Sequence, residues 1–187
     1  GLTFTRAKAP EALLRFIDNQ QVPFVTTLHA KGFLPDSHPA GLGVMGRARR
    51  TDVKSMIDQA DLVITVGFDP IEIDYEDWLG DTPLVHLSTE PVQPGTHANV
   101  AYQATGDIDS IVAQLGDLPS VENAWDRDSW AAHRRTLHKN LRPPSAKLAT
   151  HHVLDVLRAE LADDAVLTYD VGAHTHQIAT QWQADLP

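Results

Sequence analysis

The stretch VPFVTTLHAKGFLPDSHPAGLGVMG, residues 22–46, decides the expected fold of this chain. Its first part, residues 22–28, is apolar and β-branched, which predicts a buried strand. A Pro-rich loop follows, and the glycine cluster at residues 41–46 then stands just before an amphipathic segment for which Thr51 is the expected N-cap. A strand, a loop and a helix start therefore follow one another directly.

The same alternation continues along the chain. Further strands are predicted at residues 62–66, 84–87 and 101–105. Helices are predicted at residues 10–20, from Thr51 to Ala60 and from the N-cap Asp107 to Leu115, each with its apolar residues at helical spacing. Strands that alternate with helices in this way predict an α/β fold with a parallel sheet and flanking helices.

After residue 116 the character of the sequence changes. A polar helix carrying Trp125 and Trp130 leads to Arg-Pro-Pro-Ser at residues 142–145, which is typical of a linker. A helix at residues 146–161, a strand at 165–169 and a helix through Trp182 then predict the truncated start of a second α/β domain. The expected division is a central domain at 1–118, a linker helix at 119–145 and the start of a second domain at 146–187.

Composition excludes several classes of protein. The 187 residues include 15 basic and 25 acidic side chains, and the net charge of −10 disfavours nucleic acid or an anionic membrane as a partner. No apolar run approaches the roughly 20 residues of a membrane span. Without cysteine there are no disulfides and no thiol nucleophile. We expect a cytoplasmic protein and, because the chain starts at Gly1 and stops soon after a predicted helix, an internal fragment.

The glycine cluster fits the pattern G-x-G-x-x-G at Gly41, Gly43 and Gly46, whose glycines let the backbone approach a pyrophosphate. The motif does not follow its strand directly, since the Pro-rich loop intervenes. Three arginines, Arg47, Arg49 and Arg50, precede the next predicted helix. Two interpretations stay open here, an anion site and a tight turn with a solvated basic rim.

A second candidate site lies where the strand at 62–66 ends in Gly67-Phe68-Asp69. Ligands of open parallel sheets bind beyond the carboxyl ends of the strands. Gly67 would allow close approach, and Asp69 could accept a hydrogen bond from a ribose or flavin hydroxyl. In the alternative interpretation Gly67 is a turn residue only. The acidic residues at 69–77 and the histidines at 151–152 and 174–176 are better explained by solvated surface than by a metal site.

Several ordered motifs together resemble the central domain of thiamine diphosphate-dependent enzymes, in particular that of the acetolactate synthase large subunit. They are residues 23–32, 35–39, 41–46 and 60–67. Residues 67–74 with Trp78 are similar to the flavin-independent acetolactate synthases. The sequence Asp170-Val-Gly-Ala-His174 resembles the start of the third, diphosphate-binding domain of that family.

The resemblance implies a Rossmann-like central domain, whose first strand would stand before Gly1, in a subunit of three domains. This domain holds FAD in some members, ADP in others and nothing in the rest. By position, the residues that would line such a nucleotide site are Thr27, Leu28, Met45, Gly46, Gly67, Asp69 and Asp107. Gly172, Ala173 and His174 would lie at the diphosphate of thiamine diphosphate in the complete enzyme.

The resemblance also implies the chemistry of the parent enzyme. Thiamine diphosphate, bound with Mg²⁺, adds to a small 2-keto acid such as pyruvate, and the carbanion left after loss of CO₂ passes to an acceptor. The family's activating glutamate belongs to a domain that this chain lacks, and its metal-binding Gly-Asp-Gly and Asn-Asn pattern is missing, so we expect the chain alone to be inactive. The full enzyme would be a homodimer or homotetramer. Alternatives are a non-catalytic module that binds FAD, ADP or NAD, and a structural scaffold between domains.

Overall fold

Parallel strands form the centre of the structure, a computed structural model that describes residues 1–46, 48–73, 76–92 and 98–186. Two sheets lie within these residues. β1 (Phe24–Thr27) pairs with β2 (Gly41–Met45), and β4 (Leu84–Ser88) lies between β3 (Val63–Val66) and β5 (Val100–Thr105). Every pairing is parallel. The predicted α/β fold class is confirmed. Arg47 and Asp74, which the sequence analysis named, lie outside the described residues.

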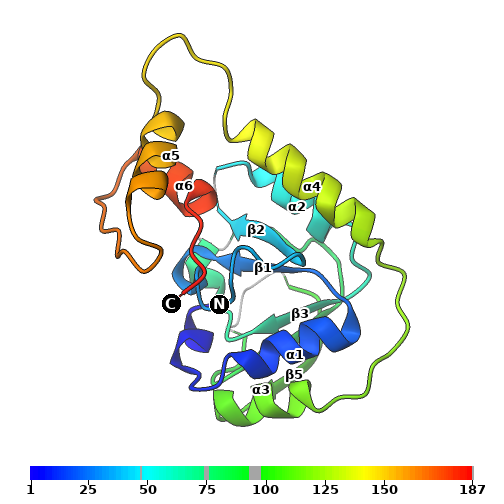
Figure 1. Cartoon of the computed structure of the whole chain (residues 1–187). Coiled ribbons are helices and arrows are strands. Elements are labelled where there is room, and N and C mark those ends of the chain that lie inside the picture. The colour runs from blue at the N-terminus through cyan, green and yellow to red at the C-terminus, as the bar shows by residue number, and fades with distance from the viewer. Residues whose placement is uncertain (47, 74–75, 93–97, 187) are drawn as a thin grey trace.

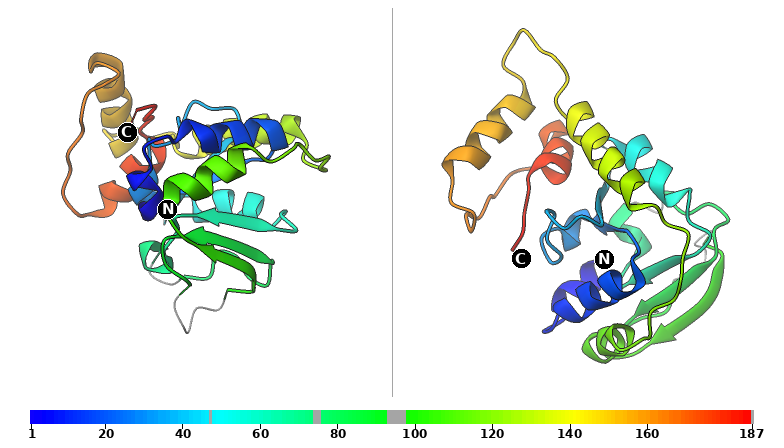
Figure 2. Two further views of the ribbon diagram at one scale, coloured as in Figure 1. Left: turned by 90° about the horizontal axis from the view of Figure 1, so that it is seen from below. Right: turned by 45° about the vertical axis from the view of Figure 1, so that its right-hand side comes forward.

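Helices cover the strands in two groups (Figure 1). α1 (Glu11–Gln20) packs against α3 (Ile108–Gly116), and α2 (Arg50–Ile57) lies with α4 (Arg127–Asn140) beside β2. Figure 1 shows the strands between these groups, and in both views of Figure 2 the orange and red helices of the C-terminal part stand away from the green strands. Short 3-10 turns, η1 (Leu2–Arg6), η2 (Leu28–Ala30) and η3 (Pro70–Ile73), lie in the connections and at the N-terminus.

The helical spacing of apolar residues predicts the core well. The expected inward residues Leu13 and Ile17 of α1 are buried in one hydrophobic cluster, together with Val112 of α3. Val53 and Ile57 of α2 are buried in a second cluster. Full burial of such a side chain contributes about 1.5–3 kcal/mol. Most of the free energy that holds these helices on the strands therefore comes from these periodic positions.

The glycine cluster at residues 41–46 is the main correction to the expected fold, because it forms strand β2 rather than a loop. Gly43 has a φ of +117°, and a Cβ there would lie 3.0 Å from Leu137 Cδ2 and 3.1 Å from Val53 Cγ2. This glycine lets α2 and α4 approach the strand closely. The predicted N-cap Thr51 is also wrong, since α2 begins at Arg50.

The last part of the chain packs as a helix pair, α5 (Thr150–Glu160) and α6 (Ala173–Gln181). Leu154, Ile178 and Trp182 form its small core. The strand predicted at residues 165–169 is not formed, although the chain there is described. Among the described residues no strand lies beside it to pair with; Val166 is 89% exposed, while Leu167 packs partly buried against the core of the helix pair.

An ion pair connects this helix pair to the segment after α4. The Arg142 guanidinium donates to both carboxylate oxygens of Asp155 at 2.6–3.1 Å, and Gln181 Nε2 donates to the same carboxylate at 2.8 Å. The hydrogen bonds from Arg142 lower the pKa of Asp155 despite its partial burial. Asp155 therefore ties α5 to both α6 and the preceding segment.

A double-mutant cycle with Arg142→Ala and Asp155→Ala should give a coupling free energy of about 0.5–1 kcal/mol, because the pair is bidentate but partly exposed. The measurement is the free energy of unfolding in urea for the four proteins. The matched control is Arg158 with Asp163, whose single contact is 3.5 Å long and whose carboxylate is exposed. A coupling no larger than that of the control would show that Asp155 does not tie the helices together.

The buried His86 should make the stability of the folded protein depend on pH. It is 1% exposed in the middle of β4, with Nδ1 3.0 Å from Thr65 Oγ1 and Nε2 3.2 Å from the Glu90 carbonyl. Burial lowers the pKa of His86 below 6.5. The unfolded state then binds the proton more readily, so stability is complete above about pH 6.5 and decreases as the pH falls.

The free energy of unfolding should therefore be lower at pH 5.5 than at pH 7.5. Two other groups act in the same direction, His138, whose pKa is also lowered by burial, and the buried Gly1 amine, whose pKa is lowered to about 6. Urea denaturation of wild type, His86→Gln and His138→Gln at both pH values gives the contribution of each histidine. We expect a smaller pH dependence in His86→Gln than in wild type, and an unchanged dependence in that variant would contradict the assignment.

Candidate functional site

The candidate ligand site lies at the carboxyl ends of β1 and β3, the first strands of the two sheets. From β1 the chain proceeds outward to β2, then crosses to β3 and proceeds outward in the other direction to β5. In open parallel sheets, ligands bind at the carboxyl ends of the strands where the order reverses. The residues that follow β1 and β3 are Thr27 with Leu28, and Gly67 with Asp69. The sequence analysis had named all four.

Glu72, in η3, occupies the centre of this region. Its side chain is only 1% exposed. Oε1 accepts hydrogen bonds from the backbone N–H of Leu2 at 2.8 Å and of Asp69 at 3.0 Å. Oε2 accepts one from Thr27 Oγ1 at 2.5 Å. One buried carboxylate therefore holds together the ends of β1 and β3 and the N-terminal segment.

Glu72 was missed as a functional residue, because the sequence analysis interpreted its neighbourhood as a solvated acidic loop. Its partners Leu2 and Thr27 are 70 and 45 residues away along the chain. No local pattern indicates contacts over such separations. The only signal in the sequence was position, since Glu72 closely follows the carboxyl end of a predicted strand at a site where ligands bind.

Glycine is required at position 67 because the backbone of Phe4 approaches it closely. The group that approaches Gly67 therefore belongs to this chain and not to a ligand. The φ of Gly67 is +60°, and a Cβ on Gly67 would lie 2.3 Å from the backbone nitrogen of Phe4. Its carbonyl accepts a hydrogen bond from Thr3 N–H at 2.9 Å. The Gly1 amine donates to the Val66 carbonyl at 2.8 Å, and burial lowers the pKa of that amine to about 6, although Glu72 opposes the shift. The segment with η1 thus covers the end of β3.

Of the other predicted nucleotide residues, Met45 lies next to Thr27, its register partner on β1. Met45 is buried at the end of β2 and packs in the cluster of α2 and α4, and Gly46 follows it. Asp107 lies beyond β5, and β4 separates it from β3. Its carboxylate accepts from Ser110 N–H and Ser110 Oγ, both at 2.9 Å, which lowers its pKa and makes it the N-cap of α3.

Two of the three arginines named for an anion site, Arg49 and Arg50, are engaged with carboxylates. Arg49 Nε donates to Asp52 Oδ2 at 2.6 Å. Arg50 forms an ion pair with Glu76, and its guanidinium lies 4.8 Å from the centre of the Trp78 ring. These contacts favour the alternative of a basic rim paired with neighbouring acids.

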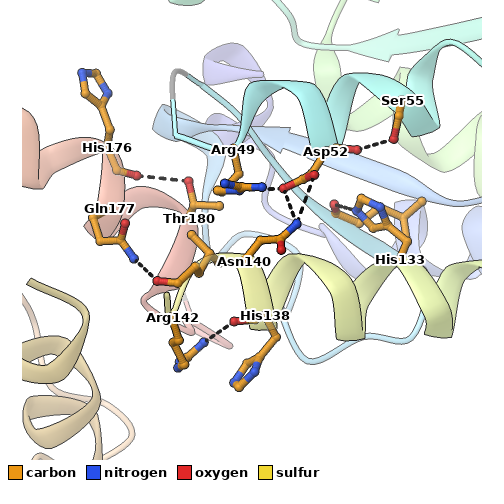
Figure 3. Close-up of polar contacts among 12 residues, drawn as sticks. Arg49, Asp52, Ser55, His133, His138, Asn140, Arg142, His176, Gln177 and Thr180 are labelled. Carbon is orange, nitrogen blue, oxygen red and sulfur yellow. Dashed lines mark hydrogen bonds and ion pairs between the residues drawn. The ribbon is translucent and has the colours of Figure 1, made fainter. Parts of the chain in front are cut away.

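Polar contacts also fix α4 on the central strands (Figure 3). His133 Nε2 lies 2.8 Å from the Leu42 carbonyl of β2, and Asn140 Nδ2 donates to Asp52 Oδ2 at 3.2 Å. Burial tends to raise the pKa of Asp52, but the hydrogen bonds from Arg49 and Asn140 outweigh it and lower that pKa. The helix expected in the linker therefore packs against the sheet.

The second set of predicted residues begins α6. Gly172 is the N-cap, and its N–H donates to Thr175 Oγ1 at 3.1 Å, while that hydroxyl donates to the Asp170 carbonyl at 3.0 Å. Ala173 and His174 occupy the first turn, where N–H groups have no acceptor within the helix. Both residues are exposed. The helix start therefore presents amides with a partial positive charge to an anion.

The described part of the chain contains no group of three or more His, Asp or Glu residues that could hold a metal ion. The neighbouring rings of His151 and His152 are 4.1 Å apart, and neither has the third ligand that a site would need. None of the described helices is long and apolar enough to cross a membrane.

These features define a class of protein that contains a Rossmann-like α/β domain. The family model for the central domain of thiamine pyrophosphate enzymes matches residues 1–115. The chain therefore belongs to the thiamine pyrophosphate enzyme family through its central domain.

Three relatives align with most of this chain. A putative thiamine pyrophosphate-containing protein, YdaP, of Bacillus subtilis is 30% identical over 184 residues, which is 94% of this chain and 31% of the relative. The acetolactate synthase isozyme 1 large subunit of Escherichia coli is 29% identical over 188 residues, 96% of this chain and 33% of the relative. Acetolactate synthase of Bacillus subtilis is 30% identical over 193 residues, 93% of this chain and 32% of the relative. The chain spans about a third of the length of these relatives.

Proposed function

We propose that this chain is the central domain and the beginning of the diphosphate-binding domain of an acetolactate synthase-like enzyme, which decarboxylates a small 2-keto acid and forms a C–C bond. The observation that supports this most strongly is the contrast between the two candidate sites. The chain's own carboxylate and N-terminal segment fill the site between β1 and β3, whereas the start of α6 presents exposed amides. We propose that the assembled enzyme is a cytoplasmic homodimer or homotetramer.

The start of α6 offers hydrogen-bond donors that suit the diphosphate of thiamine diphosphate. The amides of Ala173 and His174 would bind phosphate oxygens, and the Thr175 hydroxyl keeps the turn at Asp170 and Gly172 in place. A side chain at position 172 would require the exposed imidazole of His174 to turn away, because its Cε1 lies 2.7 Å from the position of a Cβ. Bound thiamine diphosphate supplies the electron sink for decarboxylation. The described residues offer no Mg²⁺ site, so we assign the metal ligands to the remainder of the enzyme.

The second candidate, a module that binds FAD or ADP, gains no support from the geometry. A nucleotide at Thr27, Gly67 and Asp69 would have to displace Glu72 and the segment around Phe4. Freshly purified chain should therefore release no flavin or ADP on denaturation, as mass spectrometry would show. Release of a stoichiometric nucleotide would favour this second candidate.

A chimera tests the proposed function. Residues 1–186 would replace the matching segment of the Bacillus subtilis acetolactate synthase, and formation of acetolactate from pyruvate would be measured with thiamine diphosphate and Mg²⁺. We expect activity above background, dependent on the cofactor. The matched variants are Gly172→Val, which should raise the concentration of thiamine diphosphate needed, and Gly106→Val, which changes an exposed glycine with open space around it and should not.

A folded chimera that binds thiamine diphosphate and lacks activity would contradict an acetolactate synthase-like role and favour the structural scaffold. Binding is measured separately by titration calorimetry, so that loss of cofactor affinity and loss of turnover are distinguished. Equal effects of the two glycine variants on cofactor affinity would contradict the role assigned to the start of α6.

A further inference from the structure

A cavity of about 400 Å³ lies where β2, α4 and the end of α6 meet. Volumes of about 300–1,000 Å³ are typical of pockets that bind small molecules. No residue of the two candidate sites described above lines this cavity. α6 contributes Thr180 and Gln181 from its last turn, whereas the residues predicted to bind a diphosphate begin that helix. The cavity is therefore a separate place at which a ligand could bind.

The lining of the cavity is basic, although the whole chain has a net charge of −10. Five of the described lining residues have basic side chains, and they are Lys31, Arg134, Arg135, His138 and Arg142. The described lining contains one acidic residue, Asp36. Because a cleft lined by charges of one sign attracts ligands of the other sign, this lining indicates an anionic ligand.

Two of the five basic residues already have carboxylate partners. Lys31 forms an ion pair with Asp36, and Arg142 forms the bidentate pair with Asp155 that ties the helix pair to the segment after α4. These two pairs are balanced in charge. The excess of positive charge in the cavity therefore comes from the remaining basic residues, all of which belong to α4.

The charges of Arg134 and Arg135 are not balanced by an acid in the described part of the chain. Arg134 Nη1 donates to the carbonyls of His38 and Gly41, both at 2.7 Å, and its other acceptors are also backbone carbonyls. These contacts hold the guanidinium in place without neutralising its charge. Arg135 is exposed and has no hydrogen bond or ion pair with another described residue. Two neighbouring arginines of this kind suit a ligand with two negative charges.

His138 follows Arg134 by one helical turn, so both lie on the same face of α4. Figure 3 shows its ring on the same side of that helix as Arg142. Burial and the charge of Arg142 lower the pKa of His138, although Asp155 opposes them. An anion in the cavity would favour the protonated ring. The ring of His138 therefore reports whether the cavity is occupied.

The rest of the wall determines the body of the ligand. It is largely apolar, and its apolar side chains are those of Phe24, Val44, Leu137, Leu141 and Trp182. Apolar walls with a few polar groups are typical of sites for small organic molecules. A phosphate monoester carries about −1.5 to −2 charges at neutral pH, and arginine binds phosphate oxygens in a bidentate manner. An organic phosphate would therefore match both parts of the lining.

We propose that this cavity binds a small organic phosphate, with the phosphate group at Arg134 and Arg135 and the apolar body against Leu141 and Trp182. Since β2, α4 and α6 all contribute to the wall, the bound molecule would stabilise the packing of α6 against the central strands. The inference does not depend on the proposed function, because it uses none of the residues assigned to thiamine diphosphate.

NMR titration of the chain with phenyl phosphate tests the proposal, at a constant ionic strength of about 0.15 M so that screening does not change. The ring signals of His138 and His174 are followed, because His174 would report an anion at the start of α6 instead. We expect saturable shifts at His138 and a rise in its pKa. Inorganic phosphate lacks the apolar body and benzoate lacks the second charge, so each should bind at least about tenfold more weakly.

Two variants of α4 locate the effect. Arg135→Gln removes a charge-assisted hydrogen bond and should weaken the binding of phenyl phosphate at least about tenfold. Arg127→Gln makes the same change at an exposed arginine that does not line the cavity, and binding should stay unchanged. Circular dichroism checks that both variants fold.

The possible contrary results separate the site from its ligand. Equal effects of the two variants, or shifts at His174 without shifts at His138, would overturn the site. Binding of benzoate or inorganic phosphate as tight as that of phenyl phosphate would overturn the assigned class of ligand.

Discussion

Replacing Gly67 by alanine should lower the free energy of unfolding by about 3 kcal/mol, since two costs combine at this residue. The φ of +60° is unfavourable for an L-residue by roughly 1–2 kcal/mol. The new Cβ would lie 2.3 Å from Phe4 N and 2.9 Å from Phe4 Cα, so backbone has to move, at a further cost of about 1–3 kcal/mol. Urea denaturation followed by circular dichroism measures the sum.

Gly80→Ala separates these two costs. Gly80 has a φ of +55°, but no atom lies within 4 Å of the position of its Cβ. Its alanine variant should therefore show the conformational cost alone. A loss in Gly67→Ala no greater than that in Gly80→Ala would contradict the close packing of the N-terminal segment on β3.

Replacing Glu72 by alanine should have an effect of similar size, about 3–5 kcal/mol of unfolding free energy. The substitution removes the acceptor of two backbone N–H groups, Leu2 and Asp69, and of the Thr27 hydroxyl. Each polar group left buried without a partner costs about 1–3 kcal/mol. The ends of β1 and β3 and the N-terminal segment would lose their common partner.

The measurement is again urea denaturation, with Glu72→Gln and Glu11→Ala as comparisons. Glutamine keeps the shape and one acceptor oxygen and should lose less than alanine. Glu11 is exposed in the first turn of α1, so its alanine variant should change stability by less than about 0.5 kcal/mol. If Glu72→Ala resembled Glu11→Ala, the carboxylate would not be the connection that the geometry describes.

The arrangement of helices and strands could be predicted because it depends on local periodicity. Apolar positions such as Leu13 and Ile17, or Val53 and Ile57, repeat at helical spacing and are buried as expected. Asp107 signals its helix by an N-cap residue type, and it does cap α3. These features need no knowledge of distant parts of the chain.

The errors arose where distant residues decide the structure. The glycines at residues 41–46 resemble a phosphate loop, yet Gly43 is a strand residue whose missing Cβ admits Leu137, 94 positions further along. Residues 165–169 have the composition of a strand but no partner to pair with. Gly67 was correctly expected to allow close approach, but the group that approaches it, Phe4, is recognisable only in the folded chain.

The residues of the candidate sites also fall into two groups, those that a local rule predicts and those whose position depends on distant contacts. Thr27, Gly67 and Asp69 were predicted from the rule that ligands bind at the ends of parallel strands, and the structure brings them together around Glu72. Glu72 itself could not be chosen among the acidic residues at 69–77, because its burial depends on contacts with both β1 and the N-terminus. That Thr27, Gly67 and Asp69 bind a ligand stays a prediction.

We propose that this chain contributes architecture and a part of the cofactor site, while the remaining catalytic residues belong to the rest of the enzyme. Incubation of the purified chain with pyruvate, thiamine diphosphate and Mg²⁺, with release of CO₂ and formation of acetolactate measured together, tests it most directly. The account predicts rates equal to those of thiamine diphosphate and Mg²⁺ without protein. Turnover of pyruvate by the folded chain above that background, dependent on protein concentration, would contradict it.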